Sequence, residues 1–248
     1  MRNRQILGRA AFGGLAVLAL ATPAAAETIS LDLGANGGLT NRIVELIALI
    51  TVLSIAPSIL IMVTSFVRIS VVLSLLRTAL GLQQSPPNSV LISLALFLTA
   101  FIMAPTFKEA YTNGVQPYLE DSAPLADSFA KTSKPFQRFM LAHVSESDLA
   151  LFIDMAGNPK PKTAEETPLT TLIPAFLISE LKRAFEIGFL LFVPFLVIDM
   201  VVSSVLMSMG MMMLPPVIIS LPFKLIFFVL CDGWHLVAGS HVKSFAPH

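Results

Sequence analysis

Long uncharged stretches alternate with short polar ones along this chain of 248 residues. The first uncharged stretch, 46–67, has 22 residues and holds Pro57 near its middle. About 20 apolar residues span a bilayer as a helix, so this stretch is long enough, with a kink or break expected at the proline. A second apolar stretch follows at 89–107, with Pro105 near its end. The pattern predicts a first apolar helical hairpin over residues 43–107.

The connection between these two stretches carries Arg68 and Arg77, which flank apolar residues at helical spacing. Gly81 is placed to end this helix, and the turn SPPN makes Asn88 the expected N-cap of the next helix. Short loops that hold arginine and lysine stay on the cytoplasmic side of a membrane. The chain before residue 46 is therefore expected outside the cytoplasm.

Residues 108–172 form the one extended polar insertion, with six basic and nine acidic residues. The segments KPFQRFMLAHV and SESDLALFIDMAG each predict a helix. In the second, Ser145 and Asp148 have the spacing of a capping box, and Gly157 is placed to stop the helix. The shortage of positive charge favours an extracytoplasmic location for this insertion and its linker.

The C-terminal region, 173–248, is predicted to be a second apolar hairpin with an interrupted pattern. Twelve uncharged residues precede Asp199, and 24 more follow it through Phe223, broken by three prolines. A hydropathy profile alone draws two spans, at 187–208 and 215–236. The expected fold class is all-α, with membrane-associated helical hairpins, proline-interrupted apolar helices and a small helical insertion.

The first 26 residues have the three parts of a secretory signal peptide. Three arginines precede an apolar stretch, and a run of small residues ends at Ala26. We expect cleavage after Ala26, with 27–42 as a flexible lead-in to the mature chain. An uncleaved anchor helix is the alternative.

Composition narrows the class of protein further. Hydrophobic residues make up 55% of the chain and charged residues only 13%, against about 25% in soluble domains, which indicates a membrane-associated protein. A net charge of zero gives no basic surface for nucleic acid. The sequence has no GxSxG, HExxH, CxxC or glycine-rich phosphate loop, which argues against hydrolases, metalloenzymes and ATPases. We therefore expect no enzymatic activity, no cofactor and no metal.

Asp199 is a carboxylate in the middle of a predicted span, where a charge costs about 2.5–3.5 kcal/mol on insertion scales. It can pair with a basic residue such as Lys224, Arg68 or Arg77. It can carry protons or ions. In the third interpretation, this segment does not face lipid in the mature assembly. Structural pairing or burial in protein is favoured.

The segment LISELKRAFEIG, 177–188, carries four charges at helical i,i+3 and i,i+4 spacing: Glu180, Lys182, Arg183 and Glu186. A solvated charged turn is the simplest interpretation. The apolar residues around it leave little room for a water-facing stripe, so ion pairing between subunits is at least as well favoured.

Methionines cluster where the apolar pattern breaks, in SVLMSMGMMMLPP. Met211, Met212 and Met213 are consecutive, so they cannot share one face of a helix, and Gly210 together with the prolines favours a loop. An apolar loop at membrane depth must be buried by protein or line a cavity. Copies of Met209 and of the three consecutive methionines around an axis would form a soft apolar plug that blocks ions by dewetting.

These segments resemble the FliP family of flagellar type III export-gate proteins, which is related to injectisome subunits. The similarity is carried by PAFLISELKRAFEIGF, by PFLVIDMVVSSVLMSMGMMMLPP, by the block around SFVRISVVLSLLRTALGLQQSPPN and by FMLAHVSESDLALF. Together these motifs cover nearly everything after residue 40. The signal peptide and the pattern of the insertion favour the flagellar branch over the virulence-secretion relatives.

The resemblance implies a pentamer-like homo-oligomer that forms a helical ring with FliQ-like and FliR-like subunits and contacts other membrane proteins of the export apparatus. It places the ring at the bacterial inner membrane, in the flagellar basal body, around the path of unfolded export substrates. It implies that the methionine loop closes the pore and that Glu180 matches the acidic position of the family's SEL motif. It also implies that Phe139 and Phe152 pack the extracytoplasmic helices.

The sequence thus predicts a pore-forming subunit of the flagellar export gate. An ion- or proton-coupled transporter with Asp199 and Glu186 as a relay is the main alternative, although the paired repeats that such transporters show are missing. An intramembrane enzyme is weakened by the absent motifs.

Overall fold

The computed structural model describes residues 39–157, 161, 163–211 and 214–245, and all regular structure within these ranges is helical. The expected all-α class is confirmed. The signal peptide with Ala26, and the greater part of 27–42, lie outside the described residues. The chain divides into two compact units, 1–51 and 52–248. Of the first unit only 39–51 is described, and it forms the start of helix α2, which covers Leu39–Met62.

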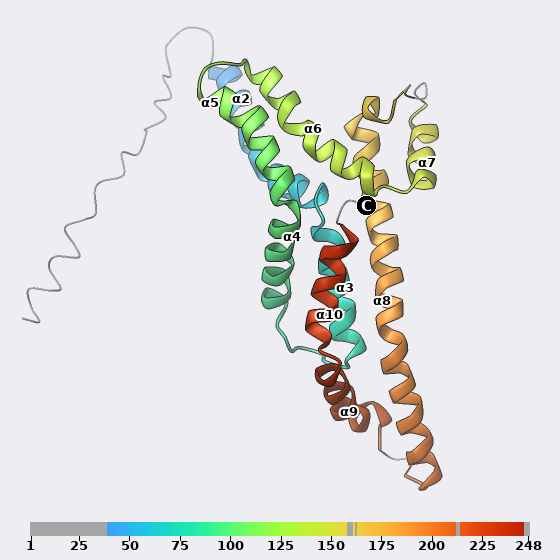
Figure 1. The fold of residues 1–248 in the computed structure, drawn as a ribbon. Coiled ribbons are helices and arrows are strands. Elements are labelled where there is room, and N and C mark those ends of the chain that lie inside the picture. The colour runs from blue at the N-terminus through green and yellow to red at the C-terminus, as the bar shows by residue number, and fades with distance from the viewer. Residues whose placement is uncertain (1–38, 158–160, 162, 212–213, 246–248) are drawn as a thin grey trace, which may run out of the picture. The chain divides into compact units, whose positions relative to one another are not determined.

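The remaining helices belong to the second unit (Figure 1). In chain order they are α3 (Phe66–Ala79), α4 (Asn88–Ala110), the π-helix η2 (Tyr111–Val115), α5 (Gln116–Leu119), α6 (Leu125–His143), α7 (Glu146–Ala156), the 3-10 turn η3 (Ala164–Glu166), α8 (Leu169–Ser208), α9 (Pro216–Leu230) and α10 (Gly233–Ser244).

The main core forms where α3 packs along α8, the most extensive helix contact of the unit (Figure 1). Helix α3 presents Ile69, Leu73 and Leu76 at helical spacing, and all three are buried. Phe195 of α8, Phe228 of α9 and buried residues of α4 and α10 belong to the same cluster. The connection between the two predicted spans is therefore a core helix and not a solvated loop.

The polar insertion folds as a helical layer on top of this core. Helix α6 packs back against α4 and η2, while α7 packs against α8. A second apolar cluster joins Met140 of α6 to Leu172 and Phe176 of α8. The predicted helix at 134–144 begins earlier than expected, at Leu125, because the segment before it also packs on η2.

Helix α8 differs most from the hydropathy profile. It is one helix of 40 residues that contains both Pro174 and Pro194, whereas the profile draws a span only from residue 187. The last predicted span is divided into α9 and α10, which meet at an angle of 59°. Among the described residues, two helical stretches are long and apolar enough to cross a membrane, Asn88–Leu119 and Leu169–Ser208, or up to four if each bent pair counts as one span.

Two predicted helix caps differ from expectation: Asn88 is not at the N-cap position of α4, whereas Ser145 is at the N-cap of α7 but without a side-chain capping hydrogen bond. Asn88 is the first residue of α4 and not its cap, because its side-chain oxygen accepts a hydrogen bond from Arg77. Ser145 and Asp148 form no capping box, since the Asp148 carboxylate accepts a hydrogen bond from Ser179 Oγ at 2.7 Å. The predicted stop of α7 is confirmed: Gly157 adopts a left-handed conformation with φ of 64°.

Gly114 sets the approach between η2 and α6, because a Cβ atom placed on it would lie 2.6 Å from the backbone nitrogen of Thr132. Replacing Gly114 with alanine is expected to destabilise the folded chain by about 1–3 kcal/mol, since backbone cannot move aside as a side chain can. Thermal unfolding of the purified protein in detergent measures this. Gly239 of α10 is the matched control: a Cβ there meets nothing within 4 Å, and alanine should be neutral or stabilising. Equal unfolding temperatures for the two variants would contradict the prediction.

Candidate functional site

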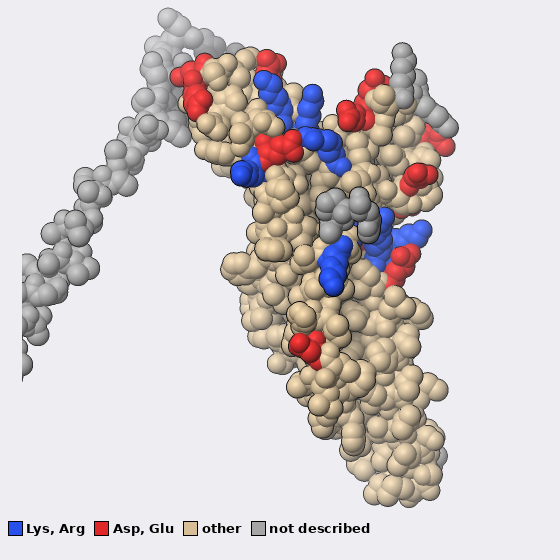
Figure 2. All heavy atoms as spheres, viewed as in Figure 1, with Lys and Arg blue, Asp and Glu red and all other residues tan. Residues whose placement is uncertain are grey.

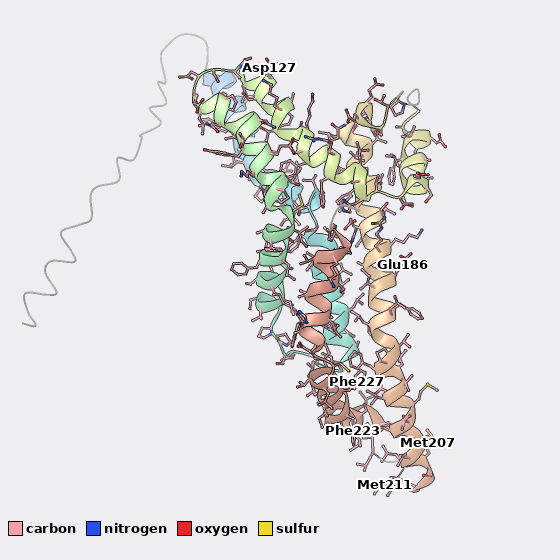
Figure 3. The ribbon with its side chains drawn as sticks, viewed as in Figure 1. Asp127, Glu186, Met207, Met211, Phe223 and Phe227 are labelled. Atoms are coloured by element: carbon pink, nitrogen blue, oxygen red, sulfur yellow. The ribbon has the colours of Figure 1, made fainter. Side chains whose placement is uncertain are left out.

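The methionine segment lies at the tip of the hairpin formed by α8 and α9 (Figure 3). Helix α8 ends in a Schellman motif: Gly210 has φ of 74°, its N–H donates to Met207 O, and the Met211 N–H donates to Leu206 O. The loop that the sequence predicts after Gly210 is confirmed as far as Met211. Met212 and Met213 lie outside the described residues.

The described methionines of this tip point away from the core. Met207 is 62% exposed, Met209 64% and Met211 45%. Leu214, on the other side of the loop, is 45% exposed. A cluster of exposed thioether and aliphatic groups at a hairpin tip is costly in water, and such clusters are typical of surfaces that contact other apolar groups.

Behind this tip, an ion pair joins α8 to α9. Lys224 Nζ lies 2.7 Å from Asp199 Oδ2 and also donates to Ala79 O, at the end of α3, at 3.2 Å. Ser220 donates to the second carboxylate oxygen of Asp199 at 2.5 Å. The Lys224 side chain is only 4% exposed, and that of Asp199 is 26% exposed. Of the interpretations open for Asp199, structural pairing with Lys224 is the one that the contacts bear out.

A second buried charge pair lies at the other end of α3. Arg68 binds Glu180 of α8 through two parallel hydrogen bonds, from Nε to Oε2 at 2.8 Å and from Nη2 to Oε1. The two side chains are 1% and 0% exposed. Ser244 accepts a third hydrogen bond from Arg68 at 3.2 Å, and the ring of Phe245 lies 3.8 Å from the guanidinium carbon. The pair therefore ties α3, α8 and the end of α10 together.

Glu180 thus finds its partner within the chain and not in the charged run around it. Within the described ranges, Lys182, Arg183 and Glu186 take part in no ion pair; Lys182 and Glu186 are exposed, and Arg183 is half-buried. Arg77 does not reach the other charges. Its guanidinium donates to Asn88 Oδ1 at 2.6 Å and to Pro86 O at 3.3 Å, which holds the turn between α3 and α4.

The two phenylalanines of the insertion have different surroundings. Phe139 of α6 packs edge-to-face on Phe176 and stacks on Phe245, both with ring centroids 5.9 Å apart. His143 lies against Phe139 and Phe245, and burial lowers the pKa of its imidazole. Phe152 of α7 is half-buried. Phe139 therefore links the insertion to the core and the C-terminal helix.

Sequence reasoning missed the partners that complete these clusters. Ser244 and Phe245 lie in a mixed C-terminal tail without periodicity, and no sequence pattern marks them as ligands of a buried arginine. Ser220 also gives no signal, as an isolated serine in an apolar stretch. Among the described residues, no group of three or more His, Cys, Asp or Glu side chains could hold a metal ion.

Comparison with known proteins agrees with the resemblance that the sequence motifs carry. The FliP family profile matches residues 49–241. The flagellar biosynthetic protein FliP of Caulobacter vibrioides is 64% identical over 93% of this chain and 88% of its own length. FliP of Bacillus subtilis is 56% identical over 82% of this chain and 91% of its own, and FliP of Aquifex aeolicus is 49% identical over 88% and 91%. The resemblance found in the sequence motifs is confirmed, and the chain belongs to the FliP family.

Proposed function

We propose that the protein is a pore-forming subunit of the flagellar export gate, with its methionine-rich tip as the gasket. Family membership gives the chain a structural, non-enzymatic role in flagellar export. The finer role is supported by one observation above all: Met207, Met209 and Met211 are exposed at the tip of a hairpin whose base is fixed by the Asp199–Lys224 pair.

Exposed apolar surface along the hairpin supports assembly in several copies. Phe189 and Met200 of α8 are 66% and 71% exposed, and Ile218 and Leu230 of α9 are 66% and 80% exposed. Contiguous apolar surface of this kind marks contact with protein or lipid. We propose that copies of this chain, with FliQ-like and FliR-like subunits, cover it in a helical ring at the inner membrane. The signal peptide and the insertion would then lie outside the cytoplasm.

In such a ring the tips converge on the axis, and the physical chemistry of methionine suits a gate there. Its unbranched side chain has three rotatable bonds and repacks around different shapes. An apolar constriction narrow enough to exclude water blocks ions by dewetting, yet it yields when an unfolded chain displaces the side chains. Branched side chains would repack less freely than methionine, and charged side chains would not exclude water.

Replacing Met209 and Met211–Met213 with alanine is expected to leave assembly intact and to raise the ion leak through the closed gate several-fold. Shorter side chains leave an opening that water can fill. The measurement is the conductance of the purified complex in a planar bilayer, with the yield of complex determined in parallel. Met200→Ala is the control, because Met200 is an exposed methionine of α8, at 71%, that lies in the body of the helix and not at the tip. Unchanged conductance in the four-residue variant would reject the gasket.

The transporter alternative gains no support from the geometry. It requires Asp199 and Glu186 to pass a proton or an ion between them. The Asp199 carboxylate is held by Lys224 and Ser220, and Glu186 is an exposed residue nearer the start of α8 that takes part in none of these contacts.

A further inference from the structure

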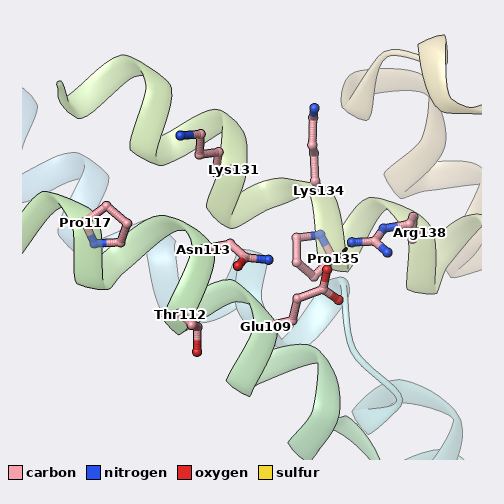
Figure 4. Close-up of a pocket in the computed structure, with 8 residues that line it drawn as sticks. All are labelled: Glu109, Thr112, Asn113, Pro117, Lys131, Lys134, Pro135 and Arg138. Atoms are coloured by element: carbon pink, nitrogen blue, oxygen red, sulfur yellow. Dashed lines mark hydrogen bonds and ion pairs between the residues drawn. The ribbon is translucent and has the colours of Figure 1, made fainter. Parts of the chain in front are cut away.

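A groove lies between α6 and the helical segment that continues α4 through η2 and α5 (Figure 4). It has a volume of about 420 Å³, which is in the range of small-molecule sites. Its charged lining residues are Lys131, Lys134 and Arg138 of α6 and Glu109 of α4. Figure 2 shows lysine and arginine side chains gathered over this part of the molecule. The groove is therefore polar and mainly basic, unlike the apolar surfaces of the hairpins.

The groove has more positive charge than the chain itself neutralises. Glu109 is the single carboxylate of its lining, and it is paired with Arg138. Lys131 and Lys134 are exposed and form no ion pair within the described part of the chain, and Figure 4 shows the Lys134 side chain extending away from Glu109. Asp127 lies one helical turn before Lys131 but does not line the groove. Three cations and one anion leave a charge of about +2 for a ligand.

Both walls of the groove supply hydrogen-bond donors for an anion. A lysine ammonium group binds phosphate as a point charge with three rotatable donors. Asn113 of η2 is an exposed lining residue on the opposite wall, and its side-chain amide can donate to an oxygen of the same anion. The walls stay close because Gly114 lets η2 approach α6: a Cβ atom on it would lie 2.6 Å from the backbone nitrogen of Thr132.

The groove lies at the end of a helix that is long and apolar enough to cross a membrane. The first 20 residues of α4, 88–107, carry no charge and rise about 30 Å, which is the thickness of the hydrocarbon layer. On this stretch Phe97 is 75% exposed and Phe101 69% exposed. Lys108 is the first charged residue after it, and Glu109 of the groove follows directly. A span over 88–107 therefore brings the groove to the level of the lipid headgroups.

The tyrosines of the chain mark the same level. The sequence has two, and each is next to a residue that lines the groove. Tyr111 begins η2 and is 53% exposed, and Tyr118 lies in α5 and is 45% exposed. Tyrosine is enriched at the boundary between membrane and water, because its ring is apolar and its hydroxyl group is polar. This observation is independent of the charges and points to the same surroundings.

We propose that the groove binds the phosphate group of an anionic phospholipid, with Lys131 and Lys134 as its cations and Asn113 as a neutral donor. The headgroup would meet the excess positive charge, and the acyl chains would lie along the exposed apolar side of α4. The apolar surface beside the groove favours a lipid over free phosphate, which leaves that surface uncovered. The inference goes beyond the proposed function and does not depend on the methionine gasket.

Native mass spectrometry of the purified protein in detergent tests the site, with equal amounts of phosphatidylglycerol and phosphatidylcholine added. Phosphatidylglycerol should be retained preferentially. Lys131→Gln with Lys134→Gln is expected to weaken its binding by about tenfold or more, because two cations at the membrane surface are lost. Lys182→Gln with Lys243→Gln is the matched control: it removes the same charge from exposed lysines outside the groove and should leave binding unchanged. Arginine at 131 and 134 should preserve binding.

The outcomes separate the sources of the phosphate group. Equal retention of the two lipids, or an equal loss in the control variant, would overturn the lipid site. Binding of inorganic phosphate that needs Lys131 and Lys134, without any preference for phosphatidylglycerol, would assign the groove to free phosphate and also overturn it. Neither result touches the gasket, which the conductance of the methionine variant tests separately.

Fluorescence quenching tests the depth of the groove without changing its charge. Tyr111→Trp is placed in a Trp234→Phe background and reconstituted in phosphatidylglycerol vesicles that contain brominated lipid. Bromine near the headgroup end of the acyl chains should quench the new tryptophan more strongly than bromine near the chain ends, because position 111 is expected at the membrane surface. Absence of quenching, or the reverse order, would overturn the placement at the headgroups and the lipid site with it.

Discussion

Glu180→Ala is expected to destabilise the folded subunit by about 3–5 kcal/mol, the cost of leaving a buried charge without its partner. The charge left behind is Arg68, which is 1% exposed and keeps, among the described residues, the hydrogen bond to Ser244 and the face of the Phe245 ring. A domain is stable by about 5–15 kcal/mol in total, so the loss is a large fraction of it. The amount of chain that accumulates in membranes should fall sharply.

Thermal unfolding of the purified subunit in detergent measures this effect before any assembly step. Glu186→Ala is the matched control: the same substitution on the same helix, at an exposed position, should change stability by no more than about 0.5 kcal/mol. The double variant Arg68→Met, Glu180→Leu should recover much of the stability, because a buried pair can be replaced by apolar side chains of similar volume. If Glu180→Ala and Glu186→Ala unfold at the same temperature, the buried pair does not have the role described here.

This expectation separates Glu180 from the rest of its charged run. Spacing in the sequence groups it with Lys182, Arg183 and Glu186 as candidates for pairing between subunits. The structure assigns Glu180 to the interior of the chain, so its loss should harm folding first and assembly only as a consequence. The three other charges face outward or lie half-buried, and a role in contacts between subunits stays a prediction for them.

Lys224→Met is expected to have the second largest effect, about 3 kcal/mol, because among the described residues it leaves Ser220 as the remaining hydrogen-bond donor to the Asp199 carboxylate. The cost should lie at the low end for a buried pair, since Asp199 is 26% exposed and water can partly solvate it. The loss also frees Ala79 O at the end of α3. Helix α9 should therefore loosen from both α8 and α3, and the methionine tip should lose its fixed position.

Hydrogen exchange followed by mass spectrometry locates the change. Faster exchange is expected in α9 and at the end of α8, with little change in α6 and α7. Lys243→Met is the matched control, because Lys243 is an exposed lysine of α10. A double-mutant cycle with Asp199→Leu isolates the pair: the two substitutions together should cost less than their sum. Additive costs would show that Lys224 and Asp199 do not stabilise each other.

Much of the fold follows from local pattern. Apolar residues at helical spacing place α3 on the core, and Gly157 and Gly210 end α7 and α8 where the sequence indicates. These features depend on residues within a few positions of one another. The continuous α8 was less predictable, because Pro174 and Pro194 favour breaks while packing against α3 and α7 holds the helix together.

The site divides in the same way. The loop character of the methionine segment and the candidacy of Lys224 as a partner of Asp199 are present in the sequence. The sequence does not show that Glu180 is the partner of Arg68. The two residues are 112 positions apart, and other carboxylates along the chain carry the same charge as Glu180. The side-chain oxygens of Asn88 and Asp148 accept hydrogen bonds from Arg77 and Ser179, so tertiary partners take the positions that local geometry offered to the backbone. The Ser145 hydroxyl instead bonds to its near neighbour Ser147.

The sequence by itself therefore determined the helical class, the apolar segments, the main stops and the family, because backbone hydrogen bonds in a helix are local and apolar periodicity is written along the chain. Only the tertiary structure decided which charges are buried together, which partners those charges find and which side of α7 stays exposed. Those outcomes depend on packing between helices far apart in sequence, and the low polarity of the interior makes each buried charge require one specific partner.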